Sequence, residues 1–205
     1  MSEYYTIAVI ALLAAISPGP DFVVVTKNAI AYHRRHAVIT SLGTGIGILV
    51  HSTYCVLGLA IVISQSLLLF SLIKYLGASY LIYLGIKSLF AKNSETPSQF
   101  QKSLPDYGIW LAFRDGLLTN VLNPKATLFM LSVFTLVVKP HTPIYVQAIY
   151  AIEIAFITTT WFIFLSYGMT HSIVRLKIKK VQQLITKLIG TVLITLGIVV
   201  IFESR

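Results

Sequence analysis

The chain is poor in charge and in cysteine. Only 11% of its 205 residues are charged and 56% are apolar, with a mean hydropathy of +0.82. A soluble domain carries roughly 25% charged residues, so this composition indicates an integral membrane protein surrounded by the lipid bilayer. The single cysteine, Cys55, lies in an apolar run. One chain can therefore form no disulfide, CxxC redox pair or structural zinc site, which excludes a membrane thiol-redox carrier.

Acidic residues are scarcer than basic ones. Seven Asp and Glu stand against 16 Lys and Arg, which gives a formal net charge of +9. The basic residues lie between apolar runs, so membrane orientation explains them better than nucleic-acid binding, and no nucleic-acid partner is expected. The sequence has no HExxH, GxSxG or Walker loop. We therefore expect no enzyme activity, no cofactor and no metal site.

Six apolar windows are long enough to cross a membrane, which takes about 20 residues. The N-terminus lacks the positive region of a signal peptide and is interpreted as part of a retained first span. Prolines interrupt the first and fourth windows. The predicted fold class is an all-α integral membrane protein with six transmembrane helices, of which helices 1 and 4 are broken at the proline motifs. The windows are roughly 4–30, 37–64, 67–90, 110–138, 144–170 and 184–203.

The two halves of the chain resemble each other. Residues 72–90 align with 184–202 through repeated identities, and the interrupted spans align so that Pro20 falls on Pro124. A repeat of three spans must place its second copy upside down in the membrane. The sequence therefore predicts two inverted three-helix repeats, the plan of many secondary transporters, whose substrate site lies where the broken helices meet.

The repeats are expected to form one membrane domain. Residues 1–92 form the first repeat and 109–205 the second, joined by a polar linker, 93–108. Basic residues gather after the first span, around the linker and before the last span. The positive-inside rule places these segments in the cytoplasm and both termini outside. The basic residues are Lys27, Arg34, Arg35, Lys87, Lys92, Lys102, Arg114, Arg175, Lys177, Lys179, Lys180 and Lys187.

The first interrupted span carries the motif SPGPDF. Pro18 and Pro20 have no N–H group, so carbonyls one turn upstream lose their helical partners. Such carbonyls are tolerated at membrane depth only where protein or a wet cavity surrounds them. Gly19 or Ser17 can cap the new half-helix. Pro20 then occupies its first position and Asp21 its first turn, where the helix dipole favours an anion.

The second interrupted span has the same pattern with the opposite charge. Asn123 is a good N-cap and Pro124 a good first residue, but Lys125 follows where the dipole disfavours a cation. Either Asp21 or a substrate carboxylate can compensate Lys125, and a zwitterion can engage both. The alternative is a buried ion pair that only fixes helix packing. Asn120, one turn before Pro124, can hydrogen-bond the freed backbone or a ligand.

Two further polar side chains are candidates within the membrane. Glu153, near the middle of span five, can carry a proton or bind an ammonium group, or it can be a neutral, hydrogen-bonded acid in helix packing. His51 shares one helix face with Gly43 and Gly47 and is equally compatible with a cavity wall and a satisfied core. Three tyrosines of the third span are expected to serve packing and the membrane interface: Tyr75, Tyr80 and Tyr83.

Three segments resemble the LysE/RhtB family of bacterial amino-acid exporters. They are SPGPDF in the first span, GASYLIYLGIKSL in the third and GLLTNVLNPKATLF in the fourth. The resemblance implies a small inner-membrane carrier that expels amino acids or related metabolites and is energised by the proton motive force. The motif positions that it implies for the site are Pro18, Gly19, Pro20, Asp21, Asn120, Asn123, Pro124 and Lys125.

The sequence is interpreted as an amino-acid exporter coupled to protons. Asp21 is assigned to the amine or the proton, Lys125 to the carboxylate and Glu153 to a second proton. The alternative is a divalent-cation exporter, because Asp21, Glu153 and His51 offer oxygen and nitrogen ligands, although Lys125 would repel a metal ion. The polar helix breaks disfavour a non-transporting scaffold. A homo-oligomer is compatible with the sequence.

Overall fold

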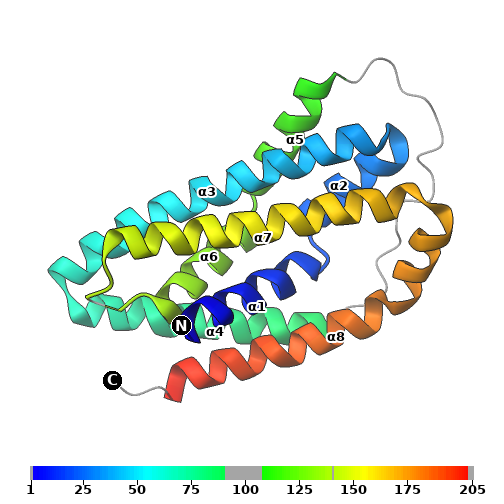
Figure 1. Cartoon of the computed structure of the whole chain (residues 1–205). Helices are drawn as coiled ribbons and strands as arrows, with labels where there is room; N and C mark the ends of the chain where they lie inside the picture. The colour runs from blue at the N-terminus through cyan, green and yellow to red at the C-terminus, as the bar shows by residue number, and fades with distance from the viewer. Residues whose placement is uncertain (1, 91–107, 140, 203–205) are drawn as a thin grey trace.

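The structure is a computed structural model that describes residues 2–90, 108–139 and 141–202. These residues form eight helices and no strand (Figure 1). Of the expected linker, 93–108, only Gly108 lies within the described residues. The helices are α1 (Ser2–Ile16), α2 (Pro20–Ala31), α3 (Arg34–Gln65), α4 (Leu67–Leu89), α5 (Ile109–Val121), α6 (Pro124–Val137), α7 (Ile144–Thr170) and α8 (Ser172–Phe202).

Two helices are long and apolar enough to cross a membrane: α3, over Arg34–Gly58, and α7. Two more candidate spans are added if α1 with α2, and α5 with α6, each count as one broken span. The apolar stretch Thr186–Val199 of α8 is shorter. The described residues therefore contain two to four candidate spans by length and composition, which agrees with an all-helical membrane protein without confirming six.

Both expected interruptions coincide with bends. The axes of α1 and α2 differ by 57°, and those of α5 and α6 by 59°. In each case the second half-helix begins at a proline, Pro20 or Pro124. Proline suits the first position of a helix because its missing N–H would have no helical partner there.

Long helices surround the two breaks (Figure 1). Helix α3 packs along α5 and α7, while α4 packs along α8 and contacts α6. Small residues allow these close contacts, because a Cβ on Gly116 would collide with the Thr40 carbonyl oxygen, and one on Gly85 would lie 2.6 Å from the Gly190 oxygen. We call the α3–α5 and α4–α8 contacts the two glycine seams.

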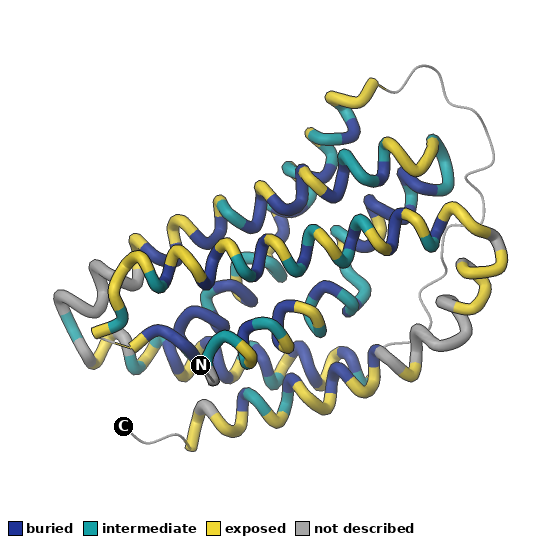
Figure 2. The backbone as a smooth tube through the Cα atoms, viewed as in Figure 1, coloured by how far each residue is buried: buried dark blue, intermediate teal, exposed yellow. Residues whose placement is uncertain are grey.

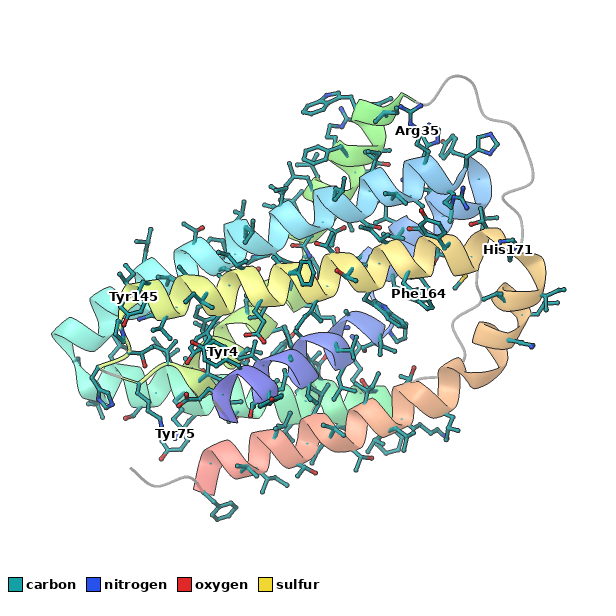
Figure 3. The ribbon with its side chains drawn as sticks, in the orientation of Figure 1. Tyr4, Arg35, Tyr75, Tyr145, Phe164 and His171 are labelled. Atoms are coloured by element: carbon teal, nitrogen blue, oxygen red, sulfur yellow. The ribbon has the colours of Figure 1, made fainter. Side chains whose placement is uncertain are left out.

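Buried and exposed residues alternate along each helix (Figure 2), and many polar side chains are buried while large apolar ones are exposed. Asn28, His51 and Ser166 are fully buried, whereas Phe156 and Phe164 are exposed. This is the distribution expected of a helical membrane protein, because lipid solvates apolar side chains but cannot hydrogen-bond polar ones. Arg35 and His171 lie at one end of the bundle, and Tyr75 and Tyr145 at the other (Figure 3).

Candidate functional site

The first helix break lies between α1 and α2. The N–H of Ser17 donates to the Leu13 carbonyl at 3.1 Å, which closes the end of α1. Gly19 is the N-cap of α2, with an extended backbone (φ −162°) and no side-chain cap bond. Any residue can adopt that backbone, so the conformation does not require glycine. The space is tight, because a Cβ on Gly19 would lie 3.2 Å from Lys125 Nζ.

The second break, between α5 and α6, is closed by side chains. The Asn123 side-chain oxygen accepts the Lys125 backbone N–H at 3.0 Å, so Asn123 caps α6 as expected. Pro124 has no N–H to give to the Asn120 carbonyl. That carbonyl accepts from the Asn123 N–H at 2.9 Å and from His51 Nε2, also at 2.9 Å. The freed backbone group is therefore satisfied within the protein.

His51 consequently serves the architecture of the second break. A carbonyl oxygen only accepts hydrogen bonds, so Nε2 of His51 carries the hydrogen in this arrangement. Its Nδ1 contacts the hydroxyls of Tyr54 and Thr127. His51 is fully buried and is not among the residues that line the cavities described below. His51 is thus buried, with contacts to polar groups from both ring nitrogens.

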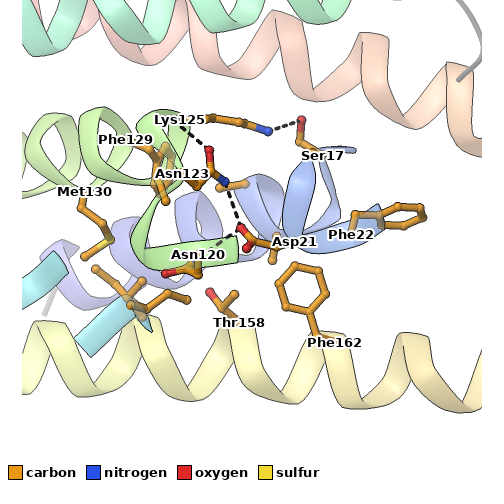
Figure 4. A pocket seen from close by; sticks show the side chains of 16 residues that line it. Ser17, Asp21, Phe22, Asn120, Asn123, Lys125, Phe129, Met130, Thr158 and Phe162 are labelled. Atoms are coloured by element: carbon orange, nitrogen blue, oxygen red, sulfur yellow. Dashed lines mark hydrogen bonds between the residues drawn. The ribbon is translucent and has the colours of Figure 1, made fainter. Parts of the chain in front are cut away.

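Asp21 extends from the first break to the second (Figure 4). Its Oδ2 accepts from the side-chain amide of Asn120 at 3.1 Å and from that of Asn123 at 3.3 Å. Its Oδ1 is buried and has no hydrogen-bond partner. Buried carboxylate oxygens are normally satisfied, so Oδ1 is free to hold a proton or to contact a bound ligand.

Lys125 extends from the second break to the first (Figure 4). Its Nζ donates to the Ser17 hydroxyl at 3.3 Å. Lys125 and Asp21 do not form an ion pair with each other, and neither is in any ion pair of the described residues. The arrangement thus differs from the buried pair that was the packing alternative, since both charges have neutral partners.

A narrow cavity of about 60 Å³ lies between the breaks, α3 and α7. Asp21 and Lys125 both line it, and Ile154, Thr158 and Phe162 form its wall on α7 (Figure 4). A space of this size can hold an ammonium group or a few waters. Its polar lining consists of Ser17, Asp21, Asn120, Asn123, Lys125 and Thr158.

A wide cavity of about 570 Å³ lies on the opposite side of the breaks, against α4 and α8. It shares Ser17, Gly19, Asn123 and Lys125 with the narrow cavity, so these four residues separate the two spaces. Asp21 lines only the narrow cavity. The polar lining of the wide cavity consists of Ser17, Tyr80, Tyr83, Lys87, Ser88, Asn123, Lys125 and Thr186.

Glu153 is not brought together with these residues. It is half-buried on α7, where its Oε2 has no hydrogen-bond partner, and it lines neither cavity. Its neighbour Ile154 faces the narrow cavity instead. No group of three or more His, Cys, Asp or Glu side chains that could hold a metal ion occurs among the described residues.

Three lining residues of the wide cavity escaped the sequence analysis. Tyr80 and Tyr83 were assigned to packing, and Lys87 was counted only as a cytoplasmic charge. Their spacing carries a usable signal, because residues three, four and seven positions apart share one face of a helix. Two tyrosines and a lysine on one face of a membrane helix form a polar stripe, and in the structure this stripe lines the wide cavity.

Comparisons with known proteins identify a family and several relatives. A family model described as "LysE type translocator" matches residues 12–204. The "uncharacterized membrane protein YrhP" of Bacillus subtilis is 34% identical over 196 residues, which cover 92% of this chain and 93% of that protein. The "threonine efflux protein" of Escherichia coli K12 is 35% identical over 138 residues, or 66% of each chain. No solved structure gives a significant match.

Proposed function

This chain belongs to the LysE type translocator family, and we propose that it exports amino acids or closely related metabolites across the bacterial inner membrane in exchange for protons. The similarity to threonine efflux proteins supports the substrate class. One observation carries the proposal. Asp21 and Lys125 come from two separate helix breaks, line the same narrow cavity and have neutral partners only.

A zwitterion matches this pair of charges. The substrate ammonium binds the free Oδ1 of Asp21, and its carboxylate binds Nζ of Lys125. Ionisable groups within membrane spans cost roughly 2.5–3.5 kcal/mol each on insertion scales and usually serve function. Asn120 and Asn123 hold the Asp21 carboxylate in place between substrates, while Ser17 holds the lysine.

Asp21 also carries the exchanged proton in this proposal. Its free oxygen can be protonated when no ammonium occupies the narrow cavity, so proton and substrate exclude each other at one group. Glu153, with its own unpartnered oxygen on α7, is proposed as a second proton carrier.

Two inverted repeats, 1–92 and 109–205, are proposed to form one membrane domain around this site, with the linker 93–108 in the cytoplasm. The nearly equal bends of 57° and 59° support this plan, as do the pairings of α3 with α7 and of α4 with α8. Both termini are proposed to lie outside. The ion pair of Glu3 with Lys139, at 3.5 Å, holds the N-terminal helix near the segment between α6 and α7.

Thiol labelling tests this orientation. Exposed positions Arg35 and His141 are each replaced by cysteine in a Cys55→Ser chain, which has no other thiol. A membrane-impermeant reagent added to intact cells should label His141→Cys, whereas Arg35→Cys should be labelled only in inside-out vesicles. Labelling of both from the same face would disprove the proposed orientation.

Transport by the purified protein in liposomes tests the function itself. Vesicles loaded with unlabelled threonine should take up labelled threonine by exchange. An imposed pH gradient should then drive accumulation against the threonine gradient. The liposomes without protein serve as the control. Failure to exchange any amino acid would refute the proposed substrate class, and exchange that ignores the pH gradient would refute proton coupling.

A further inference from the structure

The wide cavity contains two positive charges and no compensating negative one. Lys87, on α4, and Lys125, on α6, both line it. No Asp or Glu is among the described residues of its lining. Like charges that share a partly enclosed space raise the energy of both, and a bound anionic or electron-rich group relieves that repulsion.

The sizes of the two cavities decide how an amino acid can fit. The narrow cavity measures about 60 Å³ and the wide cavity about 570 Å³, so the wide cavity offers far more room for a side chain. Asp21 lines only the narrow cavity, so a substrate whose ammonium contacts Asp21 reaches the wide cavity past the shared residues, Ser17, Gly19, Asn123 and Lys125. Its carboxylate then lies at Lys125, and its side chain extends into the wide cavity.

We infer that the wide cavity is the side-chain pocket of the carrier and that Lys87 selects the charge of the side chain. Amino acids with neutral polar or anionic side chains are accepted, and those with cationic side chains are rejected. This inference rests on the proposed function, since it takes the ammonium and carboxylate positions from it.

Lys87 is the selecting residue because Lys125 is already engaged by the substrate carboxylate. The positive charge that remains in the pocket is that of Lys87, which a second cation would oppose. Tyr80 and Tyr83 line the same pocket, with ring centroids 6.0 Å apart. Their hydroxyl groups can donate to or accept from a side-chain hydroxyl or carboxylate.

Competition in the liposome exchange assay tests the selection. Labelled threonine is exchanged in the presence of unlabelled threonine, glutamate or lysine. In the wild-type protein, threonine and glutamate should compete, and lysine should compete about tenfold less well than threonine. The Lys87→Glu variant should reverse the order of the charged amino acids, with lysine improving and glutamate weakening by about tenfold each.

Lys177→Glu is the matched control. It makes the same change of charge at an exposed lysine of α8 that lines neither cavity, so its competition pattern should equal the wild type. Gel filtration in detergent reports whether each variant is folded. If Lys87→Glu aggregates, Lys87→Gln replaces it, with the same directions and a change of about threefold.

The outcomes separate the pocket from the function. If a folded Lys87 variant exchanges threonine with the same competition pattern as the wild type, that result would overturn the proposal of a side-chain pocket and leave the proposed export function standing. A wild-type preference for lysine over threonine would overturn it as well. Absence of exchange with all three amino acids in the wild type would overturn both proposals together.

Discussion

The two helix breaks have the same geometry but different chemistry. Each places a cap and a proline at the start of a half-helix and bends the chain by nearly the same angle. Asn123 caps its own helix with its side-chain oxygen, whereas Gly19 has no side chain to offer. The first turn of α2 contains an acid, Asp21, and that of α6 a base, Lys125.

The two breaks differ in their residues because each one forms contacts with side chains of the other. The amide of Asn123 also donates to Asp21 across the interface, so one residue caps one break and positions the charge of the other. Gly19 leaves the space that the Lys125 ammonium group approaches. The breaks are therefore complementary rather than equivalent, and each half of the chain supplies what the other lacks.

The largest effect is expected from the charge of the first break. Asp21→Asn should abolish uphill export, because an amide cannot carry the proton, while the protein still folds because the amide oxygen can accept from Asn120 and Asn123. Uptake driven by an imposed pH gradient in liposomes measures this. The control is Asp115→Asn, which removes a partly exposed carboxylate 3.9 Å from Lys27. If uphill export persists in Asp21→Asn but is lost in Glu153→Gln, the role of proton carrier belongs to Glu153.

The charge of the second break should affect binding more selectively. Lys125→Gln should weaken binding of an amino acid by about 10- to 100-fold, the value of one charge-assisted hydrogen bond of ~1.5–3 kcal/mol. Binding of the corresponding amide should change much less, because the amide lacks the carboxylate. Calorimetry with the purified variant and both ligands measures the difference. Equal losses for the two ligands would show that Lys125 does not hold the carboxylate.

The double variant Asp21→Asn with Lys125→Gln sharpens the same comparison. If the two charges each bind one end of a substrate, the double variant should be folded and inactive. If they stabilise only the architecture, removing both should restore much of what either single change loses. Recovery of transport in the double variant would contradict the substrate roles.

A smaller effect is expected from the caps. Asn123→Ala should lower the free energy of unfolding by about 1 kcal/mol, since it removes an N-cap bond and leaves the Lys125 N–H unpaired. Asn123→Ser should recover part of this stability, because serine can also cap a helix. Thermal unfolding in detergent compares the three proteins. Equal stability of the alanine variant and the wild type would mean that the second break does not depend on its cap.

The smallest effect is expected at the cap of the first break. Gly19→Ala should change the free energy of unfolding by about 0.5 kcal/mol or less, because no cap bond is lost and the Lys125 chain can shift by a few tenths of an ångström. The variant should lose more free energy of amino-acid binding than of unfolding. The reason is that the atom displaced by the new methyl group is Nζ of Lys125, which is proposed to bind the substrate carboxylate. A stability loss as large as that of Asn123→Ala would show that Gly19 has a backbone role.

The sequence was sufficient to predict the centre of the site. Proline, cap and charge follow one another along the chain, so local rules identify both breaks and the half-helix starts at Pro20 and Pro124. The alignment of the halves then predicts that Asp21 and Lys125 come together. Such local rules work because the backbone polar groups freed at a break inside the membrane must find hydrogen-bond partners nearby.

Contacts between distant helices were harder to predict. The hydrogen bond from His51 to the Asn120 carbonyl joins α3 to α5, and the two residues are 69 positions apart in the chain. Lipid-facing positions are as apolar as buried ones in a membrane helix, so apolar periodicity does not reveal which face of α4 meets the breaks. Only the spacing of its polar residues, Tyr80, Tyr83 and Lys87, indicates that face. The proposed pocket role of Lys87 therefore required the three-dimensional arrangement, as did the finding that Asp21 and Lys125 form no ion pair with each other.

The glycine seams have a consequence for how the protein is made. Each seam joins a helix of the first half to one of the second, α3 to α5 and α4 to α8. During synthesis the helix surface at Gly43 has no packing partner until the segment around Gly116 has entered the bilayer. In the same way, the surface at Gly85 has none until the segment around Gly190 has entered. The last helix completes the second seam. A chain truncated before Gly190 should therefore persist as an open intermediate, exposed to the proteases that clear unassembled membrane proteins.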